Sequence, residues 1–351
     1  MTRAGGGNAV RVVAGVDLGG TAINYTFLDE QGQFLIDGLC EHPARSMDGP
    51  ATCLGQIDEG LELAASRAGI RRTDIVAVGL DTPGPASATG VLSRRGSTNF
   101  VHADWAGYDI RAGLESRLRV PVTYLNDGNA AALWGHVAIF GSENSATSVS
   151  AIIGTGLGGG VVTGGKVIIG RNGFGGELGH VLIPSGQVPG IDGLEAACNC
   201  GRTGDLESLC SLTAIRRNLL PHFLARQPDH RLARDVAATG DYAAAARLVR
   251  RLAEEGDELC RDVFRVQARA LGLFFDEMVN VFDPDALLVG GGAVETGPEF
   301  RSWFLSEIRA GMPGQREEQA GIPIHVIAGG DTAGARGAAL DAARMARERG
   351  L

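Results

Sequence analysis

The stretch VVAGVDLGGT, residues 12–21, joins an apolar run to Asp17, two glycines and Thr21, and a β-rich segment follows it at once. A buried strand that turns at Gly19 and Gly20 into a second strand presents backbone N–H groups and the Thr21 hydroxyl where a phosphate chain can lie. Asp17 is then positioned as a ligand of the accompanying magnesium or of its waters. An ordinary hairpin, whose glycines only supply positive φ, explains this motif about equally well when it is taken alone.

A second copy of this pattern decides between the two interpretations. Residues 148–170, SVSAIIGTGLGGGVVTGGKVIIG, repeat the plan of a strand, a Gly/Thr loop containing Thr155 and Gly156, and two further strands. An internal repeat of this size indicates two related halves, each offering a phosphate loop to one nucleotide. In this respect the chain resembles the sugar-kinase/actin/chaperone ATPase superfamily, whose two lobes each begin with such a hairpin.

Composition narrows the class of protein. The chain has 351 residues, is 44% apolar and carries a formal net charge of -9, so it can bury a large core and offers no basic surface for nucleic acid. The first eleven residues lack an apolar core, and no run of about 18 apolar residues is present to span a membrane. The six cysteines are mostly scattered, which argues against a disulfide scaffold. A cytoplasmic protein is expected.

Two segments place polar groups after predicted strands. The strand 74–80 runs into DTPGP, residues 81–85, at the kind of strand end where α/β folds bind ligands, although a plain rigid turn is the alternative. The strand 120–125 runs into Asn126 and Asp127 and then into an Ala-rich helix. Asp127 is explained equally by helix capping and by a general base that takes the proton of an attacking hydroxyl.

Taken together, the motifs resemble the ROK family of sugar kinases and repressors. They span almost the whole chain and comprise DLGGT, the Pro-Gly-Pro turn, LNDGNAAALWGH, GTGLGGG, GGELGH, CNCGRTGDLE and LLVGGG. The resemblance implies an α/β, two-lobed, actin-like (ribonuclease H-like) ATPase fold with duplicated βββαβαβα lobes and the active site between them. It places the small lobe at 1–125 plus 333–351 and the large lobe at 126–332.

The resemblance also implies roles for individual residues. Asp127 is the expected catalytic base. The expected sugar-binding residues are Asn99, Asn126, Asp127, Glu177, His180 and Glu207. The expected nucleotide and magnesium contacts are Asp17, Gly19, Gly20, Thr21, Thr155, Gly156, Gly290, Gly291 and Gly292, with the last three glycines at the adenosine.

A structural zinc ion is implied as well, but with a departure from the family pattern. The family places zinc on a histidine and three cysteines, whereas this chain supplies His180, Cys198, Cys200 and, in the third cysteine's position, Asp205. Aspartate can ligate zinc, so a His/Cys/Cys/Asp site is compatible with the sequence. The alternative is two free thiols beside a sugar-binding His180. The loop 181–197 is also longer than the family's usual spacing.

We expect an ATP-dependent kinase that phosphorylates a hexose at its 6-hydroxyl, with glucose first and magnesium as cofactor. The alternatives are kinases of an amino or N-acetylamino sugar: kanosamine, N-acetylmannosamine or N-acetylglucosamine. A free amine would favour a nearby carboxylate such as Asp81 or Asp104. Polyphosphate is a second donor used in the family. A sugar-sensing repressor is disfavoured, because only about a dozen residues precede the DLGGT strand and a DNA-binding domain needs more chain. The resemblance implies a homodimer.

Overall fold

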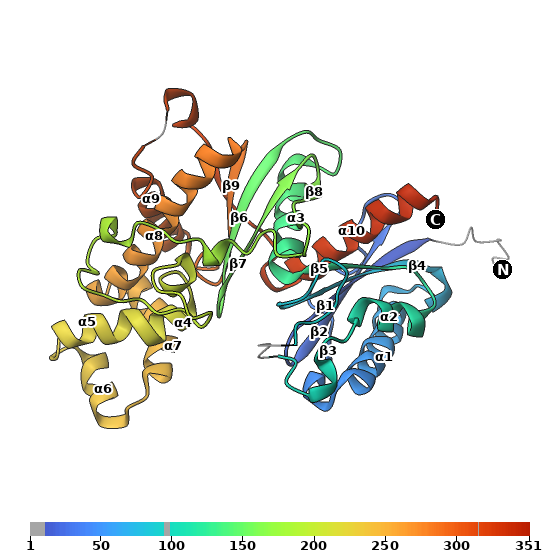
Figure 1. Ribbon diagram of the computed structural model, residues 1–351, viewed down its shortest axis with the longest axis horizontal. Coiled ribbons are helices and arrows are strands. Elements are labelled where there is room, and N and C mark those ends of the chain that lie inside the picture. Colours follow the sequence, from blue (N-terminus) through green and yellow to red (C-terminus); the bar gives the residue numbers. More distant parts are fainter. Residues whose placement is uncertain (1–10, 95–98, 315) are drawn as a thin grey trace, which may run out of the picture. The chain divides into compact units, whose positions relative to one another are not determined.

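The structure is a computed structural model that describes residues 11–94, 99–314 and 316–351, and it divides into two compact units (Figure 1). Unit 1 comprises residues 1–137, 167–175 and 331–351, and unit 2 comprises residues 138–166 and 176–330. Among the described residues, no helix has both the length and the apolar character required to cross a membrane.

Unit 1 is built on a five-stranded sheet in the order β3-β2-β1-β4-β5. β1 runs antiparallel to β2 and parallel to β4, and β4 runs parallel to β5. The strands are β1 (Val12–Leu18), β2 (Ala22–Asp29), β3 (Glu41–Pro43), β4 (Ile75–Thr82) and β5 (Val122–Asn126). Because β1, β4 and β5 are parallel neighbours, their carboxyl ends meet at one edge of the sheet.

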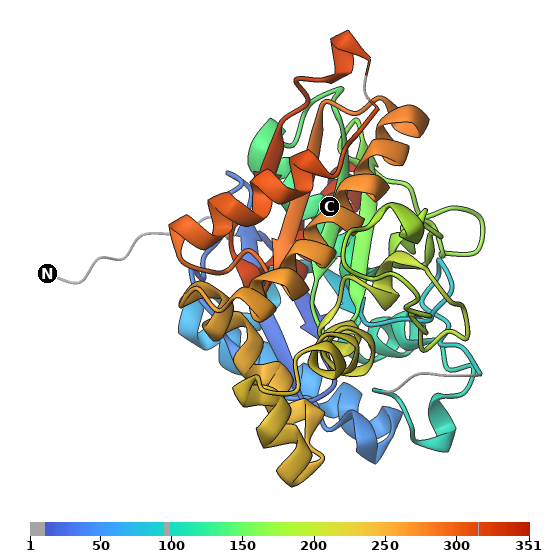
Figure 2. The same cartoon turned by 90° about the vertical axis from the view of Figure 1, so that its left-hand side faces the viewer.

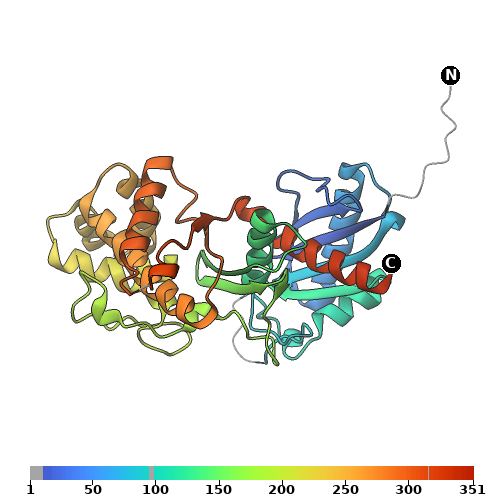
Figure 3. The ribbon, with the colours of Figure 1, turned by 90° about the horizontal axis from the view of Figure 1, so that it is seen from above.

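Helices cover this first sheet. Helix α1 begins with Pro50 at its first turn and ends at Gly69, whose φ of 70° suits the left-handed cap. The long C-terminal helix α10 packs on β1 and β4 (Figure 3). It approaches so closely that a Cβ on Gly15 or Gly79 would lie 1.9 Å from a carbonyl oxygen of α10. The helices are α1 (Pro50–Ala68), α2 (Ile110–Leu118), α3 (Asp127–Phe140) and α10 (Ala333–Arg349).

The second sheet has the order β10-β9-β6-β7-β8. β6 runs antiparallel to β7 and parallel to β9, and β9 runs parallel to β10. The strands are β6 (Thr147–Ile153), β7 (Leu157–Thr163), β8 (Lys166–Val167), β9 (Ala286–Gly291) and β10 (Ile324–Val326). This arrangement repeats that of the first sheet strand for strand, so the duplicated α/β plan predicted from the repeat is confirmed.

Unit 2 carries a larger helical layer around the buried helix α8 (Figure 2). The helices are α4 (Leu212–Ala214), α5 (Leu220–Arg226), α6 (Arg231–Thr239), α7 (Tyr242–Glu254), α8 (Glu258–Phe282) and α9 (Pro298–Ala310). Within α8 the side chains of Phe264, Phe274 and Phe275 are buried in the core of unit 2.

Candidate active site and metal centre

The first predicted phosphate loop is the turn between β1 and β2 in unit 1. The N–H of Gly19 donates to the carbonyl of Ala22 at 2.9 Å, which closes the turn. Asn99 lies against this turn, because a Cβ on Gly20 would be 2.6 Å from its Oδ1 atom. Thr21 is exposed at the tip. The structure therefore brings Asn99, predicted to bind sugar, next to the first loop.

Three carboxylates lie at or near the carboxyl ends of the parallel strands of unit 1. Asp17 in β1 stands in register with Asp81 in β4, and Asp127 follows β5 directly. Burial raises the pKa of Asp17 to about 6, while hydrogen bonds with Asp81 and Asn24 oppose that shift. Burial, and then the negative charges of Asp17 and Asp127, raise the pKa of Asp81 well above its usual range.

Asp127 is the first residue of helix α3, and it is exposed. Its Oδ1 accepts a hydrogen bond from the N–H of Gly128 at 2.7 Å, and Asn126 Oδ1 accepts from the same N–H at 3.0 Å. The side chain of Asn129 donates instead to the carbonyl of Gly175 at 3.0 Å. Capping is thus shared between Asn126 and Asp127, which leaves an exposed carboxylate held at the helix N-terminus.

The second predicted phosphate loop joins β6 and β7 in unit 2. Gly154 N–H donates to the carbonyl of Gly156 at 2.9 Å, and the carbonyl of Thr155 accepts from the Thr213 hydroxyl at 2.8 Å. The N–H of Leu157 donates to Oε2 of Glu207 at 2.9 Å. A Cβ on Gly156 would lie 2.6 Å from that same carboxylate oxygen. Glu207, which is predicted to bind sugar, therefore stabilises this loop through a hydrogen bond to its backbone.

The third glycine-rich segment closes strand β9. Gly291 has a φ of 84°, and a Cβ there would lie 2.3 Å from the carbonyl oxygen of Ile153 in the neighbouring strand β6. The carbonyl of Gly292 accepts a hydrogen bond from Arg250 at 3.0 Å. Gly291 is thus required by the packing of the two strands, which is a reason separate from any contact with adenosine.

The four predicted zinc ligands come together in unit 2. The ligand atoms of His180, Cys198, Cys200 and Asp205 all lie within 4.8 Å of one another. His180 Nδ1 is 3.1 Å from Asp205 Oδ2 and 3.8 Å from Cys198 Sγ, and Cys200 Sγ is 3.4 Å from Asp205 Oδ2. Ligand bonds of ordinary length around a tetrahedral zinc ion give edges of about 3.3–3.7 Å. The donor types suit zinc, and the three separations given above lie within a few tenths of an ångström of these edges.

The backbone around this cluster holds its members in place. Arg202 donates to the carbonyl of His180 at 2.7 Å, and the N–H of Ser208 donates to Oδ1 of Asp205 at 3.0 Å. Burial alone would raise the pKa of Asp205, but hydrogen bonds led by that from His180 lower it below its usual value. Asp205 is fully buried and ionised, as a metal ligand must be.

Predicted sugar-binding residues of unit 2 adjoin the cluster. Cys198 Sγ lies 3.4 Å from Oε1 of Glu207 as well as 3.8 Å from His180. Glu177 directly precedes the short turn Leu178–His180, and burial raises its pKa. The predicted zinc ligands thus contact a predicted sugar-binding residue through Cys198 and Glu207.

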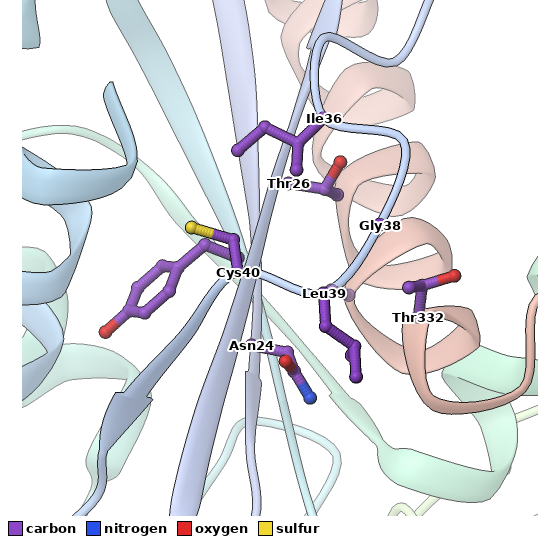
Figure 4. Close-up of a pocket in the computed structure, with 9 residues that line it drawn as sticks. Asn24, Thr26, Ile36, Gly38, Leu39, Cys40 and Thr332 are labelled. Atoms are coloured by element: carbon purple, nitrogen blue, oxygen red, sulfur yellow. The ribbon is translucent and has the colours of Figure 1, made fainter. Parts of the chain in front are cut away.

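A separate shallow recess lies in unit 1 (Figure 4). Figure 4 shows the side chains of Asn24, Thr26, Leu39 and Thr332 around it. Oδ1 of Asn24 and Oγ1 of Thr26 are buried and have no hydrogen-bond partner among the described residues. None of the residues predicted for catalysis or binding lines this recess, so it is not the candidate active site.

Asp81 is not among the residues that the sequence predicted for phosphoryl transfer. Its position directly after a predicted buried strand was the available signal, since the neighbouring strand β1 carries Asp17 near its own carboxyl end. The contact between Glu207 and the second loop joins residues that are 50 positions apart. No local pattern of residues indicates it.

Comparisons with known proteins agree with this architecture. The model of the ROK family matches residues 13–344. A glucokinase from Halalkalibacterium halodurans is 31% identical over 289 residues, which cover 82% of each chain. A kanosamine kinase from Amycolatopsis mediterranei is 29% identical over 342 residues, which cover 92% of this chain and 93% of the relative. The crystal structure of a ROK family glucokinase from Streptomyces griseus, in complex with glucose and AMPPNP, superposes with a TM-score of 0.70 at 26% identity and covers 95% of this chain and 99% of that one. The match of the family model over nearly the whole length shows that this chain belongs to the ROK family.

Proposed function

We propose that this protein transfers the γ-phosphoryl group of ATP to the 6-hydroxyl of a hexose, with glucose as the substrate. The observation that carries the proposal is the exposed carboxylate of Asp127, held at the start of α3 by the N–H of Gly128. In phosphoryl transfer the protein chiefly positions the reactants and stabilises charge, and a carboxylate accepts the proton of the attacking hydroxyl. Asp127 fills that role.

The remaining predicted residues supply binding. Asn99 and Asn126 in unit 1 offer amides to sugar hydroxyls, Glu177 and Glu207 in unit 2 offer carboxylates, and His180 offers the ring nitrogen that does not bind the metal ion. The turns at Gly19–Gly20 and Thr155–Gly156 offer backbone N–H groups to the phosphates. Asp17 holds magnesium, which when bound neutralises charge on the β- and γ-phosphates. The assignment of 1–125 plus 333–351 and 126–332 to the two lobes stays a prediction, as does a homodimer.

His180, Cys198, Cys200 and Asp205 bind a structural zinc ion in this proposal. Four protein donors would fill a tetrahedral coordination sphere and leave no open position for substrate, which is typical of structural zinc. The cluster also contacts Glu207, so the ion would stabilise the segment that carries predicted sugar-binding residues. Zinc content after purification in metal-free buffer tests this part.

A panel of sugars tests the kinase proposal. Formation of ADP is followed with magnesium and ATP, in parallel with polyphosphate, for glucose, kanosamine, N-acetylmannosamine and N-acetylglucosamine, and the position of the phosphate is read by NMR. Glucose 6-phosphate as the main product supports the proposal. Preferred turnover of an amino sugar would move the assignment to that class, for which the kanosamine kinase relative is the precedent. Sugar binding without turnover would indicate a sensor.

A further inference from the structure

Asp81 is a buried carboxylate that the proposed reaction does not yet use. It lies near the end of β4, and its side chain has no exposed surface. Apart from the neighbouring carboxyl group of Asp17, no donor in the described chain reaches either of its oxygens. A buried carboxylate without donors is costly, so such groups are normally neutral, paired or bound to a metal ion. The lack of any other donor to the two Asp81 oxygens therefore requires an explanation.

The neighbouring carboxylate makes this requirement stronger. A Cβ on Gly334 would lie 3.0 Å from Oδ2 of Asp17 and 3.2 Å from Oδ1 of Asp81, so both side chains converge on the first turn of α10. The charges that act on the pair are negative as well: Asp127 acts on Asp81, and Asp331 acts on Asp17. The N-terminal dipole of the 17-residue helix α10 offsets only about half a charge.

We propose that Asp17 and Asp81 together bind one divalent cation at the carboxyl ends of β1 and β4, before any nucleotide is present. Magnesium and manganese prefer oxygen ligands, and magnesium in nucleotide sites takes one or two carboxylates together with substrate phosphates and water. Asp17 lies two residues before Gly19, where β1 leads into the predicted phosphate loop, and Asp81 lies beside Asp17 in the neighbouring strand β4. In the proposed kinase the phosphates complete the coordination, so the inference rests on the proposed function for its role.

A bound cation and a shared proton are two different explanations for the close approach of the Asp17 and Asp81 side chains. If the two side chains only share a proton, an amide at position 81 replaces the protonated carboxyl with nearly the same shape and can donate to Asp17. If they bind a cation, the same amide removes one charge and one strong ligand. Asp81→Asn therefore separates the two explanations.

The experiment is a titration of the full-length, zinc-saturated protein with Mn²⁺ alone, followed by electron paramagnetic resonance, without sugar or nucleotide. We expect one Mn²⁺ per chain that Mg²⁺ displaces, and a loss of affinity of at least about tenfold in Asp81→Asn. Asp331→Asn is the matched control, because it removes a nearby charge from an exposed side chain, and its affinity should change by less than about threefold.

Circular dichroism and thermal unfolding verify that the variants are folded. If Asp81→Asn does not fold, Asp17→Asn and Asp81→Ser test the same ligand pair. The inference is overturned if the wild-type chain binds no Mn²⁺ at millimolar concentration, or if a folded variant binds it as tightly as the wild type. Because the titration contains no substrate, its failure is distinct from a failure of the kinase assay.

Discussion

Glu207 contacts both the second predicted phosphate loop and the predicted zinc ligands. Its Oε2 accepts a hydrogen bond from the N–H of Leu157 at 2.9 Å, and its Oε1 lies 3.4 Å from Cys198 Sγ. Both contacts lie within unit 2. The carboxylate of Glu207 thus connects the conformation of the loop to that of the predicted zinc ligands.

Replacement of Glu207 should destabilise this loop. Glu207→Ala leaves the N–H of Leu157 without its charged acceptor, and we expect the free energy of unfolding to fall by about 1–3 kcal/mol. Glu207→Gln keeps an acceptor oxygen and should lose less than half as much. Urea denaturation of the three proteins gives the values. Equal stability of the alanine variant and the wild type would show that the hydrogen bond contributes nothing.

Removal of one ligand should weaken zinc retention. Asp205→Asn keeps an oxygen for the N–H of Ser208 but loses the carboxylate charge, so the ion should leave at about 10-fold to 100-fold lower chelator concentration than in the wild type. Asp205→Cys supplies a softer ligand and should retain zinc at least as firmly as the wild type. Zinc content after dialysis against graded chelator measures both. An asparagine variant that retains zinc like the wild type would exclude Asp205 as a ligand.

The contact between α10 and the first sheet should be intolerant of added volume. In Gly79→Ala the new methyl group would lie 1.9 Å from the carbonyl oxygen of Ala338, so strand and helix must separate. We expect a loss of about 1–3 kcal/mol or more in the free energy of unfolding. Gly38→Ala is the control, since a Cβ there meets nothing within 4 Å. Similar stability of the two variants would contradict the close packing.

One ion pair gives a pH dependence of known sign. Hydrogen bonds from the Arg71 side chain, with Nη2 at 2.6 Å, hold the pKa of Asp74 below its usual value. The native state then binds fewer protons than the unfolded state, so this stabilisation is present above a pH of about 4 and is lost as the pH falls through the native pKa. The stability difference between wild type and Asp74→Asn should be constant from pH 7 to 5 and shrink below 4. A difference that grows on acidification would reverse the assigned sign.

The sheets were predictable because their signals are local. Each hairpin combines an apolar strand, a glycine turn and a second strand in one short stretch, and the two copies predicted two related halves, now seen as two five-stranded sheets of the same order. Proline is a misleading signal in one helical segment, because it usually marks the end of a helix that precedes it. Here the chain continues through the π-helical turn Ile215–Leu219 into α5, and Pro221 lies in the first turn of α5. That position tolerates proline.

The contacts at the candidate site were less predictable, since they depend on tertiary approach. Asp81 faces Asp17 only because β1 and β4 are parallel neighbours in register, and Asn99 reaches Gly20 across 79 positions of sequence. The Arg231–Thr239 helix, α6, was not anticipated, although its N-cap His230 and C-cap Gly240 are visible in the sequence. The residue types at the motif positions identified the candidate site residues. The residues that contact them could be identified only from the folded structure.

The most direct test of the central claim compares the wild type with Asp127→Asn in ATP-dependent phosphorylation of glucose, with sugar binding measured by calorimetry on the same preparations. Asparagine can still cap α3 but cannot accept the proton of the 6-hydroxyl. The account predicts glucose 6-phosphate from the wild type and a kcat about 10²–10⁴-fold lower in a folded, sugar-binding variant. A variant as active as the wild type, or a wild type that binds glucose and ATP yet forms no phosphorylated sugar, would contradict it.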